Sequence, residues 1–430
     1  MRNVKCARCI KCGAEFEATD DTYTCPNCGG VLDIIFDYKW IHSKVSRKKL
    51  AGRTEFSLWR YMEFLPIEEG SRLCPLRSGW SPLYKTGALG EAIGLDNLYI
   101  KDDGQNPTSS LKDRASAIAA VRAFRAGKGI LACASTGNAA SSLAGAAAAM
   151  GLESVIFVPA RAPQAKLTQL LIFGATVISV QGNYEETFRL SAQAIARYGW
   201  YNRNAAINPY LIEGKKTVSL EIAEQLGWRT PDFVAVSVGD GCTIAGVWKG
   251  FKDLYAAGFI DALPRLISVQ AEGCCPVNRA AAENKPIAWM DENSVADSIA
   301  VGAPRNGGKA LAAIRESNGI VVNVSDDEIL AAMRLTGRKA GVFGEPSGIA
   351  GTAGLIKAVH QKLIPPDALV VSIVTGNGLK DIAAAQRAAG SGEALSGGAV
   401  LPEEPKNLIR IEPDMAMLEH ELAARNPGNR

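Results

Sequence analysis

One lysine of this chain lies where an amine can act as a nucleophile. Residues 106–114 run Asn-Pro-Thr-Ser-Ser-Leu-Lys-Asp-Arg, so Lys112 falls between a strand-like run (98–101) and a helix-like run (113–125). Backbone N–H groups and the positive end of a helix lie near such a turn, and they can lower the pKa of an amine. Such an amine forms a Schiff base with an aldehyde, most often pyridoxal phosphate. Lys112 is therefore the candidate catalytic and cofactor-binding lysine, against the simpler alternative of a solvated surface lysine.

A turn that could hold a substrate follows the strand-like run 129–134. It consists of Ser135, Thr136, Gly137 and Asn138, and it opens an alanine-rich stretch of helical length. Free N–H groups at the start of a helix can bind a carboxylate, and the Asn138 amide can hydrogen-bond a ring oxygen of a cofactor. In the alternative interpretation, the hydroxyl residues only cap the helix.

Two more turns follow strand-like runs. The first has closely spaced glycines whose amides could surround a phosphate, and its residues are Gly239, Asp240, Gly241, Cys242 and Thr243. The second places Thr375 where its hydroxyl could meet a heterocycle nitrogen. Each turn alone is weak evidence, because tight strand-to-helix turns use glycine anyway. The coincidence of a lysine with three such turns, all at strand ends, favours one cofactor site.

The elements that must position these turns alternate along the chain from about residue 95. Further strand-like runs cover 154–158, 175–180, 233–238, 266–271, 320–324 and 369–374, and helix-like stretches include 184–198 and 326–340. This alternation predicts an α/β fold with open, mostly parallel sheets and helices on both faces. Ligands bind beyond the carboxyl ends of the strands in such sheets.

Five of the ten cysteines fall within the first 28 residues. Two Cys-x-x-Cys-Gly knuckles predict a structural zinc ribbon whose ligands are Cys9, Cys12, Cys25 and Cys28. Cys6 is then spare, or it replaces Cys9. A closed four-thiolate site has no free coordination position, so no catalysis is expected of this metal.

Composition limits the other possibilities. A chain of 430 residues predicts two or three structural units, and a net charge of +3 gives no reason to expect nucleic acid as a main partner. A ribbon that binds nucleic acid through residues 1–53 is disfavoured, because its aromatic residues are mostly at strand-like positions. No apolar run reaches transmembrane length and the N-terminus lacks a signal peptide, so we expect no membrane association and a cytoplasmic location.

Several of these motifs together resemble the threonine synthase family. The similar segments are 106–114, 135–140, 247–251 (Val-Trp-Lys-Gly-Phe), 344–347 (Gly-Glu-Pro-Ser) and 375–381. The resemblance covers roughly residues 5–385 and extends to the cysteine-rich start. It implies two open, mostly parallel sheet domains of pyridoxal-phosphate fold type II, the fold type of tryptophan synthase β, preceded by a small zinc ribbon. It also implies that Lys112 binds the cofactor aldehyde and that Asn138 contacts the ring oxygen. By the same resemblance, the 239–243 loop binds the cofactor phosphate and Thr375 faces the ring nitrogen.

The chain departs from the family in the stretch that contacts the substrate phosphate. The family pattern is Asn-Ser-Val-Asn-Pro-x-Arg ahead of Glu-Gly-x-Lys-Thr. The second part is kept at 213–217. In the first part, Ala205, Ala206 and Leu211 replace the family's asparagine, serine and arginine. In addition, Ala139 replaces the threonine that follows Asn138 in the family. Leucine cannot replace the bidentate contact of arginine with phosphate. Either Lys215, Lys216 or another basic residue binds the substrate phosphate instead, or the substrate has no phosphate.

The resemblance implies a pyridoxal-phosphate-dependent lyase, a small amino-acid substrate and a homodimer. Threonine synthase, which converts O-phospho-L-homoserine and water to L-threonine and phosphate, is the first hypothesis. The alternative is a related β-elimination or β-replacement enzyme, such as a serine/threonine ammonia-lyase or an O-phosphoserine-using synthase. We expect a zinc ribbon over 1–38, a connector over 39–95, a catalytic unit over 96–390 with a smaller subdomain inserted at about 130–210, and a peripheral tail over 391–430.

Overall fold

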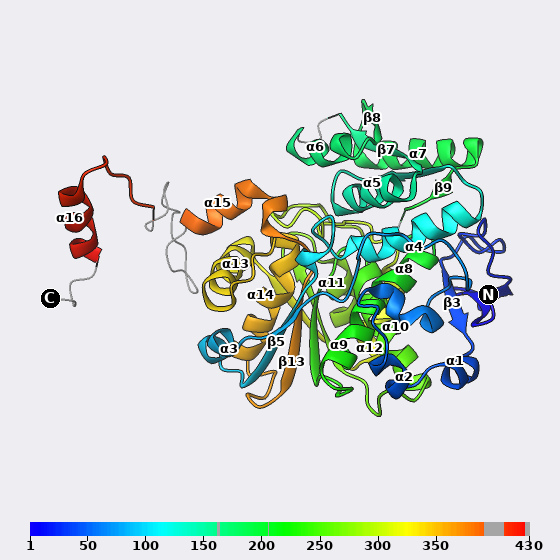
Figure 1. The fold of residues 1–430 in the computed structure, drawn as a ribbon, viewed down its shortest axis with the longest axis horizontal. Helices are drawn as coiled ribbons and strands as arrows, with labels where there is room; N and C mark the ends of the chain where they lie inside the picture. The colour runs from blue at the N-terminus through cyan, green and yellow to red at the C-terminus, as the bar shows by residue number, and fades with distance from the viewer. Residues whose placement is uncertain (161–163, 205, 391–407, 426–430) are drawn as a thin grey trace.

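The computed structural model describes residues 1–160, 164–204, 206–390 and 408–425. Within these ranges the chain forms three sheets, of three, six and four strands. Figure 1 shows the four-stranded sheet above the six-stranded one, with the three-stranded sheet beside the N-terminus. The sequence alternation therefore predicted the α/β class and the mostly parallel sheets correctly.

The N-terminal sheet is antiparallel, in the order β2-β1-β3. Its strands are β1 (Val4–Cys9), β2 (Glu15–Phe16) and β3 (Leu32–Phe36). Every second residue of β3 is buried, because one face of this strand packs on the rest of the protein. Three short helices follow: α1 (Tyr38–Lys44), α2 (Arg47–Ala51) and the 3-10 helix η1 (Leu58–Phe64).

The six-stranded sheet has the order β12-β11-β10-β13-β5-β4. Its neighbouring strands are parallel, except that β4 runs antiparallel to β5 at one edge. The strands are β4 (Leu83–Lys85), β5 (Asn97–Asp102), β10 (Phe233–Ser237), β11 (Arg265–Ala271), β12 (Ile320–Val324) and β13 (Leu369–Val374). β10 and β13 are buried along their whole length, as expected for central strands covered on both faces.

The four-stranded sheet is entirely parallel, in the order β8-β7-β6-β9. Its strands are β6 (Ile130–Ala134), β7 (Glu153–Pro159), β8 (Thr176–Val180) and β9 (Tyr201–Asn202). The eight strands predicted from apolar runs lie within one or two residues of their expected positions. β4 and β9 were missed, because strands of three and two residues are too short to show a period.

Helices cover both sheets and continue the chain from the carboxyl ends of their strands. α14 packs on β10, β11 and β13, while α10 and α12 contact the same sheet from the other side (Figure 1). The helices are α3 (Gly87–Ile93), η2 (Asp103–Gln105), α4 (Lys112–Arg125), α5 (Asn138–Met150), α6 (Gln164–Ile172), α7 (Tyr184–Tyr198), α8 (Tyr210–Lys215), α9 (Thr217–Gln225), α10 (Cys242–Ala256), α11 (Pro276–Glu283), α12 (Gly307–Glu316), α13 (Asp326–Ala340), α14 (Pro346–His360), η3 (Gly378–Lys380) and α15 (Ile382–Gly390).

The bounds of α7 and α13 match the predicted helical stretches because capping boxes fix where they begin. In α7 the Asn183 side chain accepts from the Glu186 backbone and the Glu186 side chain accepts from the Asn183 backbone. Ser325 and Glu328 make the same reciprocal bonds at α13. Each box satisfies two N–H groups that the helix itself leaves unpaired.

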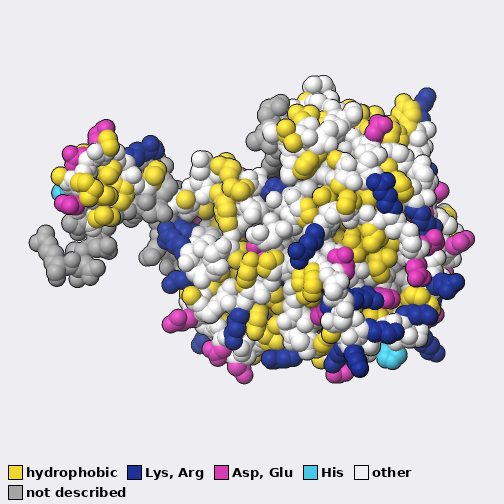
Figure 2. Space-filling model, in the orientation of Figure 1, with side chains coloured by type: hydrophobic (Ala, Val, Ile, Leu, Met, Phe, Trp, Pro, Cys, Tyr) yellow, Lys and Arg dark blue, Asp and Glu magenta, His cyan; other side chains and the backbone are white. Residues whose placement is uncertain are grey.

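The tail contains one more helix, α16 (Met415–Arg425), which Figure 1 draws apart from the other elements. Its apolar side chains are visible on the space-filling view, where basic side chains also gather over α1 and α2 (Figure 2). No helix among the described residues is long and apolar enough to cross a membrane.

Candidate active site

The turns singled out in the sequence meet at the carboxyl ends of β5, β13, β10 and β6. Backbone contacts join the Lys112 segment to the Thr375 turn: the Leu111 N–H donates to the Thr375 carbonyl (2.8 Å), and the Asn377 N–H donates to the Ser109 carbonyl (3.0 Å). An isolated bridge between Ser110 and Gly376 lies between these two bonds. The two segments are therefore held side by side, although about 260 residues of chain separate them.

Lys112 is the first residue of α4 and is half-buried. Burial and the positive charge of Lys215 lower the pKa of its amine to about 8. Arg203 lowers this pKa further, whereas Glu345 and Cys242 raise it. Position at a helix start suggested a lowered pKa, but the main causes are burial and a second lysine that the sequence motif does not contain.

This lowered pKa predicts a pH dependence for cofactor uptake. Only the neutral amine attacks an aldehyde, so uptake of pyridoxal phosphate by the apoprotein should accelerate as pH rises through about 8. An ordinary lysine would need a pH near its own pKa of about 10.4. Stopped-flow absorbance measures this rate. Lys215→Met should move the midpoint upward, because it removes the neighbouring positive charge, and Lys357→Met on the outer part of α14 should not. Equal midpoints in wild type and Lys215→Met would contradict this assignment.

The 135–138 turn leaves the start of α5 without a side-chain cap. Gly137 is the N-cap residue and makes no side-chain hydrogen bond, while the Ser135 hydroxyl accepts from the Gly137 N–H (3.2 Å). Ser135 and Thr136 are therefore not caps of this helix. The Ala140 N–H donates to the Gly137 carbonyl (3.0 Å), so in its first turn the Asn138 and Ala139 N–H groups remain available to an anionic group such as a carboxylate. Ser135, Thr136 and Gly137 are partly exposed, as a substrate-contacting turn requires.

Asn138 contacts an acidic residue at the start of α14, the helix that packs on the six-stranded sheet. Its Nδ2 donates to Glu345 Oε1 (2.5 Å), and both side chains are buried. Glu345 is the N-cap residue of α14. A Cβ added at Gly376 would lie 3.2 Å from Asn138 Nδ2 and would clash with Glu345, so glycine is required beside this pair. The sequence left the role of Glu345 open; the structure places it against Asn138 and among the charges that act on Lys112.

The glycine turn has the geometry of an anion-binding loop. Gly241 has φ +90°, and a Cβ there would lie 2.7 Å from the Asn306 carbonyl oxygen. Gly241 is the N-cap residue of α10, and no side chain accepts from the first N–H groups of this helix. Asp240 does not fill that position, because its Oδ1 accepts from the Arg305 N–H (2.6 Å). Cys242 is buried and Thr243 partly exposed at the same turn.

Thr375 directly follows β13 and is 7% exposed. Its backbone carbonyl accepts from the Leu111 N–H. Its hydroxyl makes no hydrogen bond to any residue in the described part of the chain. Thr375 therefore has a free donor and acceptor for a heterocycle bound between β13 and Lys112.

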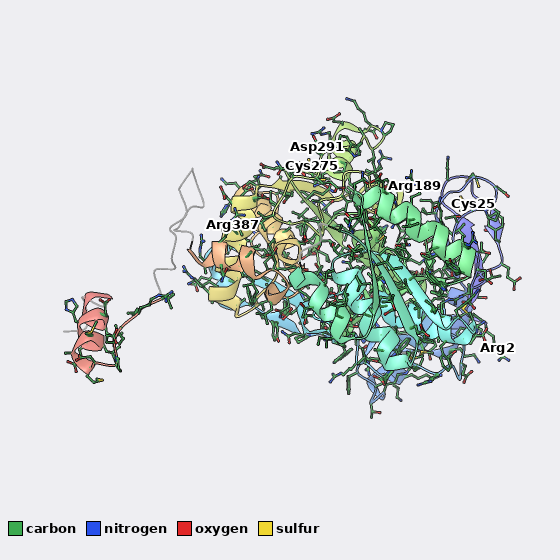
Figure 3. The ribbon with its side chains drawn as sticks, turned by 90° about the horizontal axis from the view of Figure 1, so that it is seen from above. Arg2, Cys25, Arg189, Cys275, Asp291 and Arg387 are labelled. Carbon is green, nitrogen blue, oxygen red and sulfur yellow. The ribbon has the colours of Figure 1, made fainter. Side chains whose placement is uncertain are left out.

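The four cysteines predicted as metal ligands converge. The sulfurs of Cys9, Cys12, Cys25 and Cys28 all lie within 4.8 Å of one another. Backbone N–H groups of Cys12 and Lys11 lower the pKa of Cys9, which favours the thiolate that a metal binds. Cys6 is not part of this cluster. Cys25 lies at the ribbon end of the molecule, far from Arg387 at the end of α15 (Figure 3).

Comparison with known proteins agrees with this geometry. Residues 76–376 match the family described as pyridoxal-phosphate dependent enzyme. The threonine synthase of Methanocaldococcus jannaschii is 40% identical over 418 residues, which cover 96% of this chain and 98% of that protein. The threonine synthase of Methanosarcina acetivorans is 40% identical over 87% of this chain and 92% of that protein. The chain belongs to the threonine synthase family of pyridoxal-phosphate dependent enzymes.

Members of this family are pyridoxal-phosphate-dependent lyases, and so is this chain. More distant solved structures support the fold alone. Diaminopropionate ammonia lyase from Escherichia coli superposes with a TM-score of 0.62 at 21% identity, over 78% of this chain and 93% of that one. Threonine deaminase isoform 2 from Solanum lycopersicum gives a TM-score of 0.61 at 24% identity, over 69% of this chain and 79% of that one. Fold type II is therefore confirmed.

The described residues fit the cofactor of this family. An uncapped glycine turn, an amine with a lowered pKa and a hydroxyl without a partner in the described part of the chain suit the phosphate, the aldehyde and the ring nitrogen of this cofactor.

The structure also places the departures from the family pattern. Leu211 is fully buried in the main core and Ala206 contacts Cys242 and Ala245, so neither position can bind phosphate through its side chain. Ala139 lies on the first turn of α5, and Ala205 lies outside the described residues.

Proposed function

We propose that this enzyme is a threonine synthase, which converts O-phospho-L-homoserine and water to L-threonine and phosphate. The observation that carries the proposal is 40% identity to a curated threonine synthase over 96% of this chain. Lys112 and Thr375 lie beyond the ends of the neighbouring strands β5 and β13, and Asn138 lies beyond the end of β6 in the other sheet, which supports a reaction centre between the two sheets.

The side chains would divide the work as follows. Bound pyridoxal phosphate would supply an aldehyde for Lys112 and a conjugated ring that takes up negative charge from the substrate. The Lys112 amine would move the proton at the substrate Cα, because its pKa of about 8 lies near neutral pH. The Thr136 and Asn138 N–H groups would hold the substrate carboxylate, because those of Ser135 and Gly137 already donate to the Phe157 carbonyl and to Ser135 Oγ. The 239–243 loop would hold the cofactor phosphate. Thr375 would face the ring nitrogen with a hydroxyl, which leaves that nitrogen largely unprotonated.

The test is a product assay with the purified, cofactor-loaded enzyme. O-Phospho-L-homoserine should yield threonine and phosphate in equal amounts. O-Phospho-L-serine, L-serine and L-threonine are assayed in parallel for phosphate and 2-oxo acid. Formation of 2-oxo acid from serine or threonine, with no threonine from O-phosphohomoserine, would overturn the proposal in favour of an ammonia-lyase. The apolar Ala206 and Leu211 are the observation that keeps this second candidate in the test.

We also infer that the four-cysteine cluster binds a structural zinc ion. Its support is the convergence of four sulfurs within 4.8 Å on two Cys-x-x-Cys knuckles. Cys25→Ser should lower the zinc content from about one ion per chain and reduce the melting temperature, because structural zinc contributes directly to folding. Cys6→Ser is the matched control and should keep the metal. Metal analysis and thermal unfolding measure both effects, and equal zinc loss in the two variants would contradict the assignment.

The remaining proposals concern organisation and location. All ten cysteines are free, which supports a cytoplasmic location where thiols stay reduced. The three sheets support the division into a ribbon at 1–38, a connector at 39–95, a catalytic unit at 96–390 with an inserted subdomain at about 130–210, and a tail at 391–430. Homodimerisation is inferred from the family alone.

A further inference from the structure

Two buried cations beside the candidate active site lack the carboxylates that buried cations normally have. Arg203 is fully buried and Lys215 is 1% exposed. Among the described residues, neither has a carboxylate within ion-pairing distance. An unpaired buried charge costs free energy unless a ligand or a metal compensates it. A bound anion would offset this cost for both side chains.

Arg203 follows β9 and is held beside the site by neutral groups only. Its Nε and Nη2 donate to Ser116 Oγ (3.1 and 3.0 Å), and Nη2 also approaches Ser142 Oγ (3.4 Å). Ser116 lies one turn into α4 after Lys112, and Ser142 lies one turn into α5 after Asn138. The two hydroxyls fix the guanidinium without neutralising it. Its Nη1 makes no hydrogen bond to a described residue.

Lys215 is the last residue of α8 and packs against the start of α10. A Cβ at Gly246 would lie 3.0 Å from the Lys215 Cβ. The Lys215 amine makes no hydrogen bond or ion pair with any described residue. Burial lowers its pKa, Arg203 lowers it further, and Cys242 and Asp240 raise it. Lys215 thus lies close to Arg203, to Lys112 and to the glycine loop 239–243. A ligand bound beside the Lys215 amine would be near all three.

Lys216, the other lysine of the segment, is already neutralised. Its amine pairs with Glu213 (2.6 Å) and with Asp253 (2.5 Å), and all three side chains are buried. It also lies over the Phe36 ring of the ribbon (3.7 Å). Lys216 is therefore a structural link between α8, α10 and the ribbon, and of the two candidate lysines only Lys215 remains free for a ligand.

The free lysine lies where it can replace the missing arginine. The family pattern places arginine at position 211, and Lys215 lies four residues later on the same helix. Residues four apart in a helix share one face. Arg203 lies two residues before the stretch in which the family's asparagine and serine are replaced by alanine. Two basic residues therefore lie close in the sequence to the positions at which the family's polar and charged residues are replaced.

We propose that Arg203 and Lys215 bind the phosphate group of the substrate, in place of the arginine that the family pattern places at position 211. This inference rests on the proposed function, because it assumes a phosphorylated substrate. The same chemistry could serve the cofactor phosphate, for which the 239–243 loop is the proposed site. A phosphate monoester dianion suits the pair, since a guanidinium offers several N–H donors and an ammonium a point charge.

The test measures binding of inorganic phosphate to the cofactor-loaded enzyme by calorimetry, so that the cofactor's own phosphate site is occupied. Arg203→Met and Lys215→Met should each weaken phosphate binding about ten- to one-hundred-fold, and raise the KM for O-phosphohomoserine similarly. Arg203→Lys, which keeps the charge, should retain part of the affinity. Cofactor content, read from visible absorbance, should match wild type in all three variants.

The possible outcomes separate the alternatives. Unchanged phosphate affinity in well-folded Lys215→Met would overturn the inference, and that variant keeps the side-chain volume if Arg203→Met fails to fold. If the variants lose cofactor but still bind inorganic phosphate, Arg203 and Lys215 bind the cofactor phosphate, and this result would also overturn the inference. A wild-type enzyme that binds phosphate through these residues but makes no threonine would refute the proposed function alone. Threonine formation with phosphate binding unaffected by either variant would refute this inference alone.

Discussion

Replacing Lys112 with alanine is expected to reduce threonine formation by about 10²–10⁴-fold through the loss of proton transfer alone. Covalent attachment of the cofactor would be lost as well. The neighbouring Lys216 cannot substitute, because its amine pairs with Glu213 and Asp253, and Lys215 is the residue proposed above to bind the substrate phosphate. Borohydride reduction followed by peptide mass analysis should find the pyridoxyl group on the Lys112 peptide of wild type and on no peptide of the variant.

Two controls make this result specific. Lys357→Ala removes a lysine of α14 that pairs with Glu272 and Glu328 away from the site, and it should retain wild-type turnover. The fold of Lys112→Ala should persist, since the Lys112 side chain makes no ion pair in the described part of the chain. Full turnover by a well-folded Lys112→Ala would refute both the threonine synthase and the ammonia-lyase hypotheses.

The parts of the site that the sequence predicted are those fixed by local chain geometry. Asn138, Gly241 and Thr375 follow a strand by at most four residues and Lys112 follows β5 by ten, and parallel strands bring their carboxyl ends to one edge. A strand-like run followed by glycine, asparagine or a hydroxyl residue is visible in the sequence itself. The convergence of the four cysteines is predictable for the same reason, because each pair spans one knuckle.

The parts that the sequence did not predict depend on how distant elements pack. Arg203 is near Lys112 because β9 adds to the edge of the four-stranded sheet beside β6. Lys215 is near it because α8 packs on α10, where Gly246 allows close approach. Glu345 reaches Asn138 from the start of α14, across the two sheets. One signal was available: the segment in which leucine replaces the family's arginine has two adjacent lysines. Only the ion pairs of Lys216 with Glu213 and Asp253 show that Lys215 is the one without a carboxylate partner among the described residues.

The motif that contains Lys112 also ends in a residue whose role is structural. Arg114 lies fully buried in a cluster of four charges. Its guanidinium makes a bidentate pair with Asp103 (2.7 and 2.8 Å) and a second bidentate pair with Glu221, which also binds Lys101 (2.7 Å). These contacts join α4 to η2 and to α9. Arg114 therefore fixes the start of the helix that begins with Lys112.

Arg114→Met is expected to destabilise the protein by about 3–5 kcal/mol, because it removes one partner of a buried ion cluster and leaves Asp103 and Glu221 undercompensated. The charges of Arg114 and Lys101 outweigh burial and hold the pKa of Glu221 below its usual range in the wild type. Loss of Arg114 should raise this pKa, so the free-energy difference between variant and wild type should shrink as acidic pH protonates the carboxylates. Urea unfolding at several pH values measures this.

Lys285→Met, which breaks an exposed pair with Glu283, is the control and should change stability by about 1 kcal/mol or less. A difference of that size for Arg114→Met, independent of pH, would show that the buried cluster does not stabilise the start of α4.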